Sequence, residues 1–400
     1  MRNLSADVVF PISSPPINNG VVTVDDDGTI VSIVERSTFN SDELEIFEGI
    51  ICPGFINAHC HLELSYMKGK IPEKKGIAQF IIDLIDYRNG FLLSGKERNH
   101  MEEIDTAIRN ALHEMQQNGI VGIGDISNDE CTFSHKAKSD VCFHTFIECL
   151  GFFPAKADQY FQHSLSVFEK ARALELDASI TPHAPYSVPP ELFERIFSFS
   201  QNHPPLFSYH SQESEAESRF FKNASGDFKK VFEHFKLPLS IFIPTGKNSL
   251  QSVIDFFPAD KKILFVHNTA ADATDIALIS EQLPEAYFCF CPNANLYIEN
   301  QLPQFSLFSN HSDRICIGTD SYASNHQLCI LEEIKTIQQQ HPSITTQQLL
   351  QWATLNGARF FDWDQQFGSL EPGKKPGLNL ITQTTTSFQL TNKSITEKLI

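Results

Sequence analysis

Eight short strand-like runs alternate with helical segments from residue 55 onward, and this alternation limits the folds open to the chain more than any other feature. The runs are rich in β-branched and aromatic residues, and the intervening segments carry apolar residues at helical spacing. The strands are predicted near 55–61, 120–126, 141–149, 178–181, 206–210, 263–267, 286–290 and 314–320, with helices near 101–118, 157–174, 190–201, 248–257 and 273–282. This pattern predicts an α/β fold, a closed (β/α)8 TIM barrel whose chemistry lies at the carboxyl ends of its strands.

The two ends of the chain have a different sequence pattern. Residues 6–52 contain short β-rich runs punctuated by Pro, Asn and Gly, without helical periodicity, and residues 367–381 return to this character. We therefore expect residues 1–53 and 365–400 to form a small β-sandwich domain, and residues 54–364 to form the barrel.

Charge and cysteine content exclude several kinds of partner. With 31 basic and 49 acidic residues the net charge is −18, which argues against nucleic acid or an anionic membrane surface and favours a small molecule. The nine cysteines are an odd number without a Cys-x-x-Cys pair, and no run of eighteen apolar residues or leader-like N-terminus occurs. We expect a cytoplasmic protein without a membrane partner.

Polar residues with metal-binding chemistry fall at the predicted strand ends. His59 and His61 share one face of the first strand, because alternate side chains of a strand project together. A lone histidine beside apolar residues is usually part of a core, but the other strand ends carry His183, His210, His267 and Asp320. Three imidazoles and a carboxylate, from His59, His61, His210 and Asp320, suit one divalent ion with room for a water. Glu213 follows His210 by three residues, within reach as a proton shuttle.

Several motifs extend this pattern along the chain. They are Pro53-Gly54-Phe55-Ile56-Asn57-Ala58-His59-Cys60-His61, Pro182-His183-Ala184-Pro185-Tyr186, His210-Ser211-Gln212-Glu213, Cys291-Pro292-Asn293-Ala294-Asn295, Gly318-Thr319-Asp320 with Ala323-Ser324-Asn325, and Gly368-Ser369-Leu370-Glu371-Pro372-Gly373-Lys374. Together they resemble the amidohydrolase superfamily, in its branch of cytosine-, guanine- and adenosine-type deaminases and chlorohydrolases. The run His61-Leu62-Glu63-Leu64-Ser65 is similar to that of aminodeoxyfutalosine deaminases of menaquinone synthesis.

The resemblance implies a role for each site residue. His59, His61, His210 and Asp320 would bind one metal ion, zinc or alternatively iron. Glu213 would be the acid/base, and His267 a partner for water or an oxyanion. His183 would contact the substrate. No lysine ends the fourth strand, where two-metal relatives often carry a bridging one, so the resemblance favours a mononuclear site.

The sequence departs from the superfamily pattern in two places. After His267 it reads Asn268-Thr269-Ala270-Ala271-Asp272, where many relatives have a second histidine and an acidic residue. In the C-terminal segment, Pro376-Gly377-Leu378-Asn379 replaces the usual Ala-Asp-Leu.

The sequence therefore favours a metal-dependent hydrolytic deaminase of an amino-substituted heterocycle, with an adenine nucleoside derivative as substrate. In this hypothesis Asp320 takes the proton from water, and Glu63 binds the substrate through its ribose. Guanine- or cytosine-type base deaminases, cyclic-amide hydrolases and triazine-type chlorohydrolases remain alternatives. A barrel that only binds a metabolite is disfavoured, because no required catalytic residue is missing. A homodimer is left open.

Overall fold

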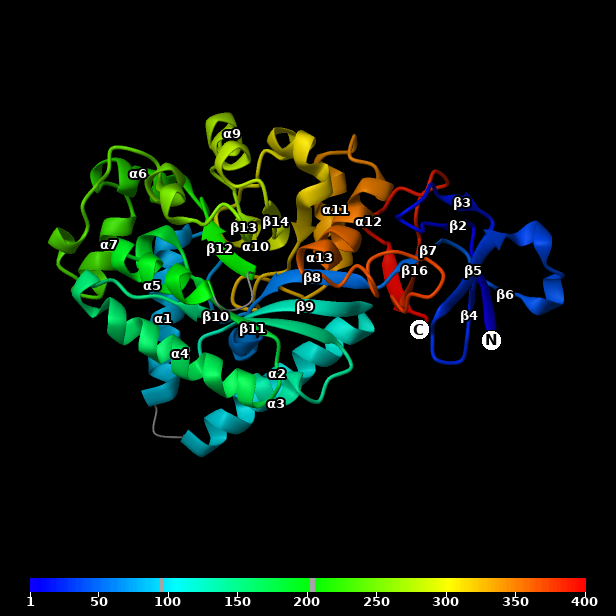
Figure 1. The fold of residues 1–400 in the computed structure, drawn as a ribbon, viewed down its shortest axis with the longest axis horizontal. Coiled ribbons are helices and arrows are strands. Elements are labelled where there is room, and N and C mark those ends of the chain that lie inside the picture. The colour runs from blue at the N-terminus through cyan, green and yellow to red at the C-terminus, as the bar shows by residue number, and fades with distance from the viewer. Residues whose placement is uncertain (94–96, 202–205) are drawn as a thin grey trace.

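The computed structural model describes residues 1–93, 97–201 and 206–400. A large body of strands and helices carries a smaller lobe of strands that holds both chain termini (Figure 1). Within the described residues, no helix is long and apolar enough to cross a membrane.

Eight parallel strands of the large body form two four-stranded sheets, ordered β11-β10-β9-β8 and β12-β13-β14-β15. Their bounds are β8 Phe55–Cys60, β9 Ile120–Ser127, β10 Cys142–Cys149, β11 Ala178–Pro182, β12 Leu206–Ser211, β13 Lys262–His267, β14 Ala286–Phe290 and β15 Ile315–Ile317. All eight lie where the sequence predicts a strand. Nearly every residue in them is buried, as parallel strands covered on both faces require.

Main-chain hydrogen bonds join the two sheets at both of their edges. Between β15 and β8, the amides of Thr319 and Asp320 each donate to the His59 carbonyl at 3.1 Å. Between β11 and β12, the amide of His210 donates to the His183 carbonyl at 2.9 Å. The carboxyl ends of the outer strands of the two sheets are therefore tied together.

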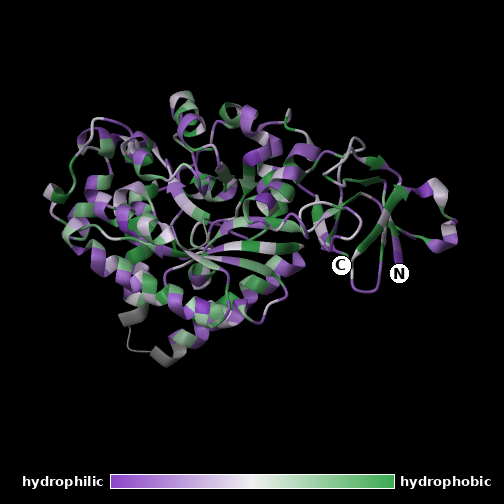
Figure 2. Cartoon of the chain, in the orientation of Figure 1, coloured by the Kyte–Doolittle hydropathy of each residue, from purple (hydrophilic) through white to green (hydrophobic). Residues whose placement is uncertain are grey.

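Helices and short 3-10 segments connect and cover the strands. The helices are α1 Ile77–Leu93, α2 Glu97–Gln117, α3 Phe133–Lys136, α4 Ala157–Ala173, α5 Pro190–Ser200, α6 Glu215–Asn223, α7 Phe228–His234, α8 Ser249–Val253, α9 Ala273–Gln282, α10 Pro292–Ile298, α11 Ile330–Gln340, α12 Thr346–Ala353 and α13 Leu355–Phe360. The 3-10 segments are η1 Arg36–Thr38, η2 Ser41–Glu43, η3 Leu62–Met67, η4 Pro154–Lys156, η5 Pro185–Ser187, η6 Leu239–Ile241, η7 Ile254–Phe256 and η8 Phe305–Arg314. Outer helices alternate hydrophilic and hydrophobic residues, as expected for helices that bury one face (Figure 2).

Local sequence signals explain several helix boundaries. Asp272 caps α9 by accepting hydrogen bonds from the amides of Thr274 and Asp275, and Ser214 caps α6. Gly119 follows α2 with a φ of +74°, a conformation that favours glycine, and leads directly into β9. The helix predicted over 248–257 is divided, because only α8 is α-helical before η7 begins.

The smaller lobe contains two sheets, ordered β5-β4-β1-β6 and β17-β16-β7-β2-β3. Their bounds are β1 Arg2–Ser5, β2 Val8–Val9, β3 Ile17–Asn18, β4 Gly20–Val24, β5 Ile30–Glu35, β6 Glu45–Ile46, β7 Ile50–Pro53, β16 Leu378–Thr382 and β17 Ile395–Lys398. The C-terminal β16 pairs antiparallel with the N-terminal β7. An apolar cluster draws on both sheets, with Leu4 and Val22 from one and Ile51 and Leu380 from the other.

Candidate active site

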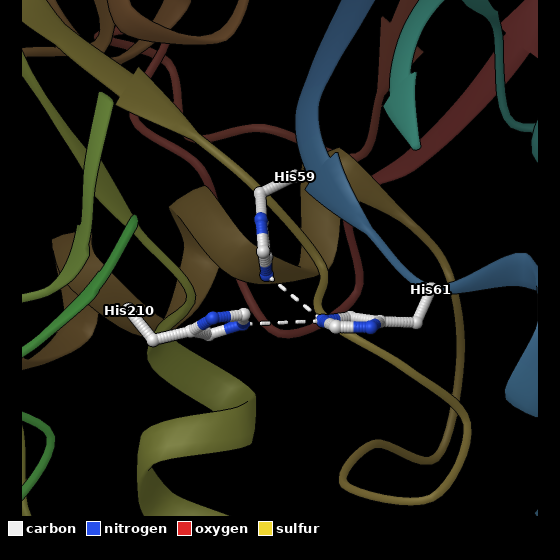
Figure 3. Close-up of side chains that lie close together, drawn as sticks. All are labelled: His59, His61 and His210. Atoms are coloured by element: carbon white, nitrogen blue, oxygen red, sulfur yellow. Dashed lines mark hydrogen bonds between the residues drawn. The ribbon is translucent and has the colours of Figure 1, made fainter. Parts of the chain in front are cut away.

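Three histidine rings converge at the carboxyl ends of the strands (Figure 3). His59 lies in β8, His61 follows that strand's last residue, and His210 lies in β12. The Nε2 atom of His61 lies 3.2 Å from that of His59 and 3.3 Å from that of His210. All three side chains are buried, so these nitrogens face one another without solvent between them.

Asp320 completes the set just beyond β15. Its Oδ1 lies 3.4 Å from Nε2 of His61 and 3.7 Å from Nε2 of His59. Ligands about 2.0–2.1 Å from a tetrahedral zinc ion lie roughly 3.4 Å from each other. The four distances among these donor atoms, between 3.2 and 3.7 Å, are therefore close to the spacing around one such ion.

The protonation of the rings also suits a metal. The Nδ1 atom of His210 lies 3.0 Å from the His183 carbonyl, which can only accept, so Nδ1 carries the proton and Nε2 keeps its lone pair. Burial, with neighbouring histidines, lowers the pKa of His59, and burial lowers the pKa values of His61 and His210 to about 3. Neutral imidazoles are the form that binds metal.

A buried ion pair supports the backbone next to His61. Asp125 of β9 accepts a hydrogen bond from the Leu62 amide at 2.8 Å, and its other oxygen lies 2.5 Å from Nζ of Lys136. Both charged side chains are fully buried. Because a buried charge needs a partner, Lys136 allows Asp125 to hold the turn that follows His61.

Glu213 stands beside the four potential ligands, in the loop that follows β12. Its carboxylate is buried, and burial, followed by the charge of Asp320, raises its pKa to about 8. The hydroxyl of Tyr186 donates to Oε2 at 3.4 Å, and Nε2 of His267 lies 3.1 Å from Oε1. A carboxyl group with this pKa holds a proton at neutral pH.

The side-chain amide of Asn295 orients the ring of His267 through a hydrogen bond to Nδ1, the nitrogen that does not face Glu213. Asn295 of α10 donates from Nδ2 to Thr269, so its Oδ1 faces Nδ1 of His267 at 2.9 Å. His267 and Asp320 both adopt the left-handed backbone region, with φ of +73° and +56°. Non-glycine residues in this region are strained, and such strain is concentrated at functional sites.

The two predicted substrate contacts both line the cavity beside the histidines. His183 is half-buried, and its Nδ1 is paired with Ser187. Glu63 is in the first turn of η3 and accepts hydrogen bonds from the amide and the side chain of Asn128, at 2.7 and 2.9 Å. The strand therefore ends before Glu63, and the carboxylate is paired with Asn128.

The cavity has a volume of about 190 Å³ and two chemically different walls. One wall is a face of α1, where Ile77, Phe80, Ile81, Leu84, Ile85 and Arg88 recur at helical spacing. The other carries the carboxylates and histidines. A separate apolar cavity of about 260 Å³ shares Phe152 and Tyr186 with it but contains none of the potential metal ligands.

Among the cavity residues that sequence reasoning missed are Arg88, Asn128, Glu148 and Tyr186. Glu148 is the penultimate residue of β10, so a carboxylate at the carboxyl end of a barrel strand was the available signal. Tyr186 lies within a recognised motif, but its bond to Glu213 depends on two different strands. Arg88 and Asn128 have no sequence signal of their own.

A model of the amidohydrolase family matches residues 50–399. The chain belongs to the amidohydrolase family. It is 27% identical over 351 residues to an adenosine deaminase of Helicobacter pylori, covering 84% of this chain and 80% of the relative. This confirms the resemblance drawn from the sequence.

Solved structures with the same fold include two deaminases. An aminofutalosine deaminase of Helicobacter pylori in complex with methylthio-coformycin has a TM-score of 0.78 at 22% identity, covering 98% of this chain and 94% of that chain. A zinc-bound adenosine deaminase of Xanthomonas campestris has a TM-score of 0.73 at 19% identity. The match covers 98% of this chain and 86% of that chain. Zinc is thus bound in a solved structure with this fold.

Proposed function

We propose that the protein is a hydrolytic deaminase of an adenine nucleoside derivative. The observation that carries this proposal is the position of Glu213 beside both His267 and the four potential metal ligands. A proton carrier next to a metal site is what replacement of a ring amino group by water requires. The names of the relatives support the same class, since they include adenosine and aminofutalosine deaminases.

The residues divide the chemistry among them. Water adds its oxygen to the amino-bearing ring carbon, the carbon–nitrogen bond breaks, and ammonia leaves. Glu213 gives a proton to the adjacent ring nitrogen and regains one from the new hydroxyl as the carbonyl forms. Asp320 takes a proton from the water and passes it to the departing amino group, and His267 fixes the attacking water. A divalent ion held by His59, His61, His210 and Asp320 would supply a Lewis acid that lowers the pKa of water.

We also propose one zinc ion as the resident cofactor, with iron as the alternative. Glu148, His183 and His210 form one of three other groups of potential ligands among the described residues. However, Nδ1 of His210 already donates to the His183 carbonyl, so it is not free for a second ion. The zinc-bound relative supports zinc.

We also propose how the chain is divided into domains. The eight strands would close into one (β/α)8 barrel over residues 54–364, and residues 1–53 and 365–400 would form a β-sandwich. A cytoplasmic location and a homodimer remain predictions.

Ammonia release from the zinc-loaded protein tests the proposal. The panel should contain adenosine, methylthioadenosine, adenosylhomocysteine, aminodeoxyfutalosine, adenine, guanine and cytosine, with a chloro-triazine and a cyclic amide for the alternatives. We expect turnover of one or more adenine nucleosides and its loss in Glu213→Gln. Turnover confined to guanine, cytosine, the triazine or the cyclic amide would contradict the proposal.

A further inference from the structure

Glu148 carries an unused hydrogen-bond acceptor inside the active-site cavity. Its side chain is buried at the end of β10, and its Oε2 accepts a hydrogen bond from Nδ2 of Asn128 at 3.0 Å. Its Oε1 accepts no hydrogen bond from any residue that the structure describes. A buried carboxylate oxygen without a donor costs free energy, so this atom is matched to a group that arrives from outside.

The neighbouring histidines do not supply the missing donor. His210 Nδ1 is 3.5 Å from this oxygen, but its proton points to the His183 carbonyl at 3.0 Å. His183 Nε2 lies 3.8 Å away, which is beyond hydrogen-bond length. Glu148 and both histidines nevertheless line the same cavity, so a ligand bound there would lie beside this oxygen.

Asn128 fixes this oxygen relative to a second carboxylate. Its amide group donates to Oε1 of Glu63 at 2.9 Å as well as to Glu148, and its main-chain amide donates to Oε2 of Glu63 at 2.7 Å. Both oxygens of Glu63 are thus engaged, whereas Glu148 keeps one free. Of the two carboxylates, Glu148 is the better placed to bind a ligand.

The local charge favours a neutral donor over an anion. Among the described residues that line the cavity, Arg88 is the only Lys or Arg, and it lies 3.6 Å from Asp129 and close to Glu63. Its charge is therefore already offset. A ligand group for this wall should bring hydroxyl protons, while the apolar face of α1 across the cavity suits the ring of a sugar or base.

We propose that Glu148, positioned by Asn128, accepts hydrogen bonds from the ribose hydroxyls of the substrate and so makes the enzyme specific for nucleosides. This inference rests on the proposed deaminase function. It assigns the sugar contact to Glu148 in place of Glu63, which becomes a positioning residue because it acts through Asn128.

A comparison of three substrates tests the assignment: adenosine, its 2′,3′-dideoxy analogue and free adenine. Wild-type kcat/KM should favour adenosine over the dideoxy analogue by about 10- to 100-fold, the usual effect of a hydrogen bond to a charged group. In Glu148→Gln the new amide oxygen stays with Asn128, and its NH2 group faces the cavity. Adenosine should then lose about 10- to 100-fold in kcat/KM, mainly through KM, while the dideoxy analogue changes less than about threefold.

Two further variants and a metal measurement separate recognition from folding. Glu169→Gln removes an exposed carboxylate from α4 and should leave all three substrates unaffected. Glu63→Gln should weaken the preference for adenosine less than Glu148→Gln does. Zinc content should stay near one ion per chain in each variant.

Several results would overturn the assignment. They are equal losses for adenosine and its dideoxy analogue, loss of zinc from Glu148→Gln, or loss of the preference in Glu63→Gln alone. If Glu148→Gln does not fold, equal wild-type rates for the first two substrates decide against it. Turnover of adenine without discrimination between sugars would refute only the Glu148 contact, whereas no ammonia from any amino-heterocycle would refute the deaminase proposal itself.

Discussion

Nε2 of His267 lies 3.1 Å from Oε1 of Glu213, and the amide of Asn295 faces the other ring nitrogen of the histidine. Because the amide oxygen accepts a hydrogen bond from Nδ1, the ring is held with Nε2 toward the carboxyl group of Glu213. Burial, followed by the charge of Asp320, raises the pKa of Glu213 to about 8. The carboxyl group proposed to carry the proton is therefore in contact with a ring that Asn295 orients.

Glu213→Gln should separate proton transfer from metal binding. The change keeps the side-chain volume but removes the proton carrier, so kcat should fall by about 10²- to 10⁴-fold. Zinc content, measured by mass spectrometry, should remain near that of the wild type. Glu215→Gln, at an exposed position two residues away, is the matched control. Turnover within about threefold of wild type would show that Glu213 does not carry the proton.

Removal of one potential ligand should deplete the metal. In His59→Ala, His61→Ala, His210→Ala or Asp320→Ala the coordination shell is incomplete, and we expect zinc affinity to fall by more than about 100-fold. Dialysis followed by metal analysis and ammonia release measures both effects. His234→Ala, which removes a surface histidine paired with Asp86, should change neither. Full metal content and turnover in any two ligand variants would contradict the assignment.

The metal-free protein should lose stability on acidification. His61 and His210 have pKa values of about 3 in the folded chain, against about 6.5 when unfolded. Below about pH 6.5 the unfolded chain binds protons that the folded chain excludes, so the free energy of unfolding falls by up to about 1.4 kcal/mol per pH unit for each histidine. This loss continues until the pH approaches 3.

Urea unfolding between pH 7.5 and 5 with a chelator present measures this slope. His61→Gln removes one titrating group and should reduce the slope, although it also alters packing. Identical slopes for the variant and the wild type would argue against neutral buried histidines. Zinc at about 100-fold above its Kd should add about 2.7 kcal/mol at neutral pH.

Lys136→Met should destabilise the protein strongly. The change leaves the Asp125 carboxylate buried without its counter-ion, which typically costs about 3–5 kcal/mol. Because Asp125 also holds the Leu62 amide beside His61, zinc affinity should fall as well. Lys138→Met, at an exposed position, is the control. A change in unfolding free energy below about 0.5 kcal/mol would show that the pair is not structurally important.

The strands and the potential ligands could be predicted because their signals are local. Each strand of the large body is a buried apolar run, and His59, His210 and His267 stand at or near the ends of such runs. The position of a residue at a strand end is enough to bring it to one rim of the sheets. Asp320 could be predicted for the same reason, because it lies three residues beyond β15.

The supporting network could not be predicted, because its members are far apart in sequence. Glu148 looks like any polar residue in a strand until Asn128 and Glu63 are placed beside it, through separations of 20 and 65 residues. Lys136 is fully buried against Asp125, eleven residues away in the sequence. Such partners depend on the packing of whole elements, which no local pattern encodes.

The hydrogen bonds between the two sheets have a consequence for how the protein opens. The His59 carbonyl accepts the amide of Asp320, and the His183 carbonyl accepts the amide of His210, so potential metal ligands join the sheets at both edges. Separation of β15 from β8 would also separate His59 from Asp320. A bound ion should therefore slow deuterium uptake at the amides of Asp320 and His210. The free energy of local opening between the two sheets would then depend on the metal.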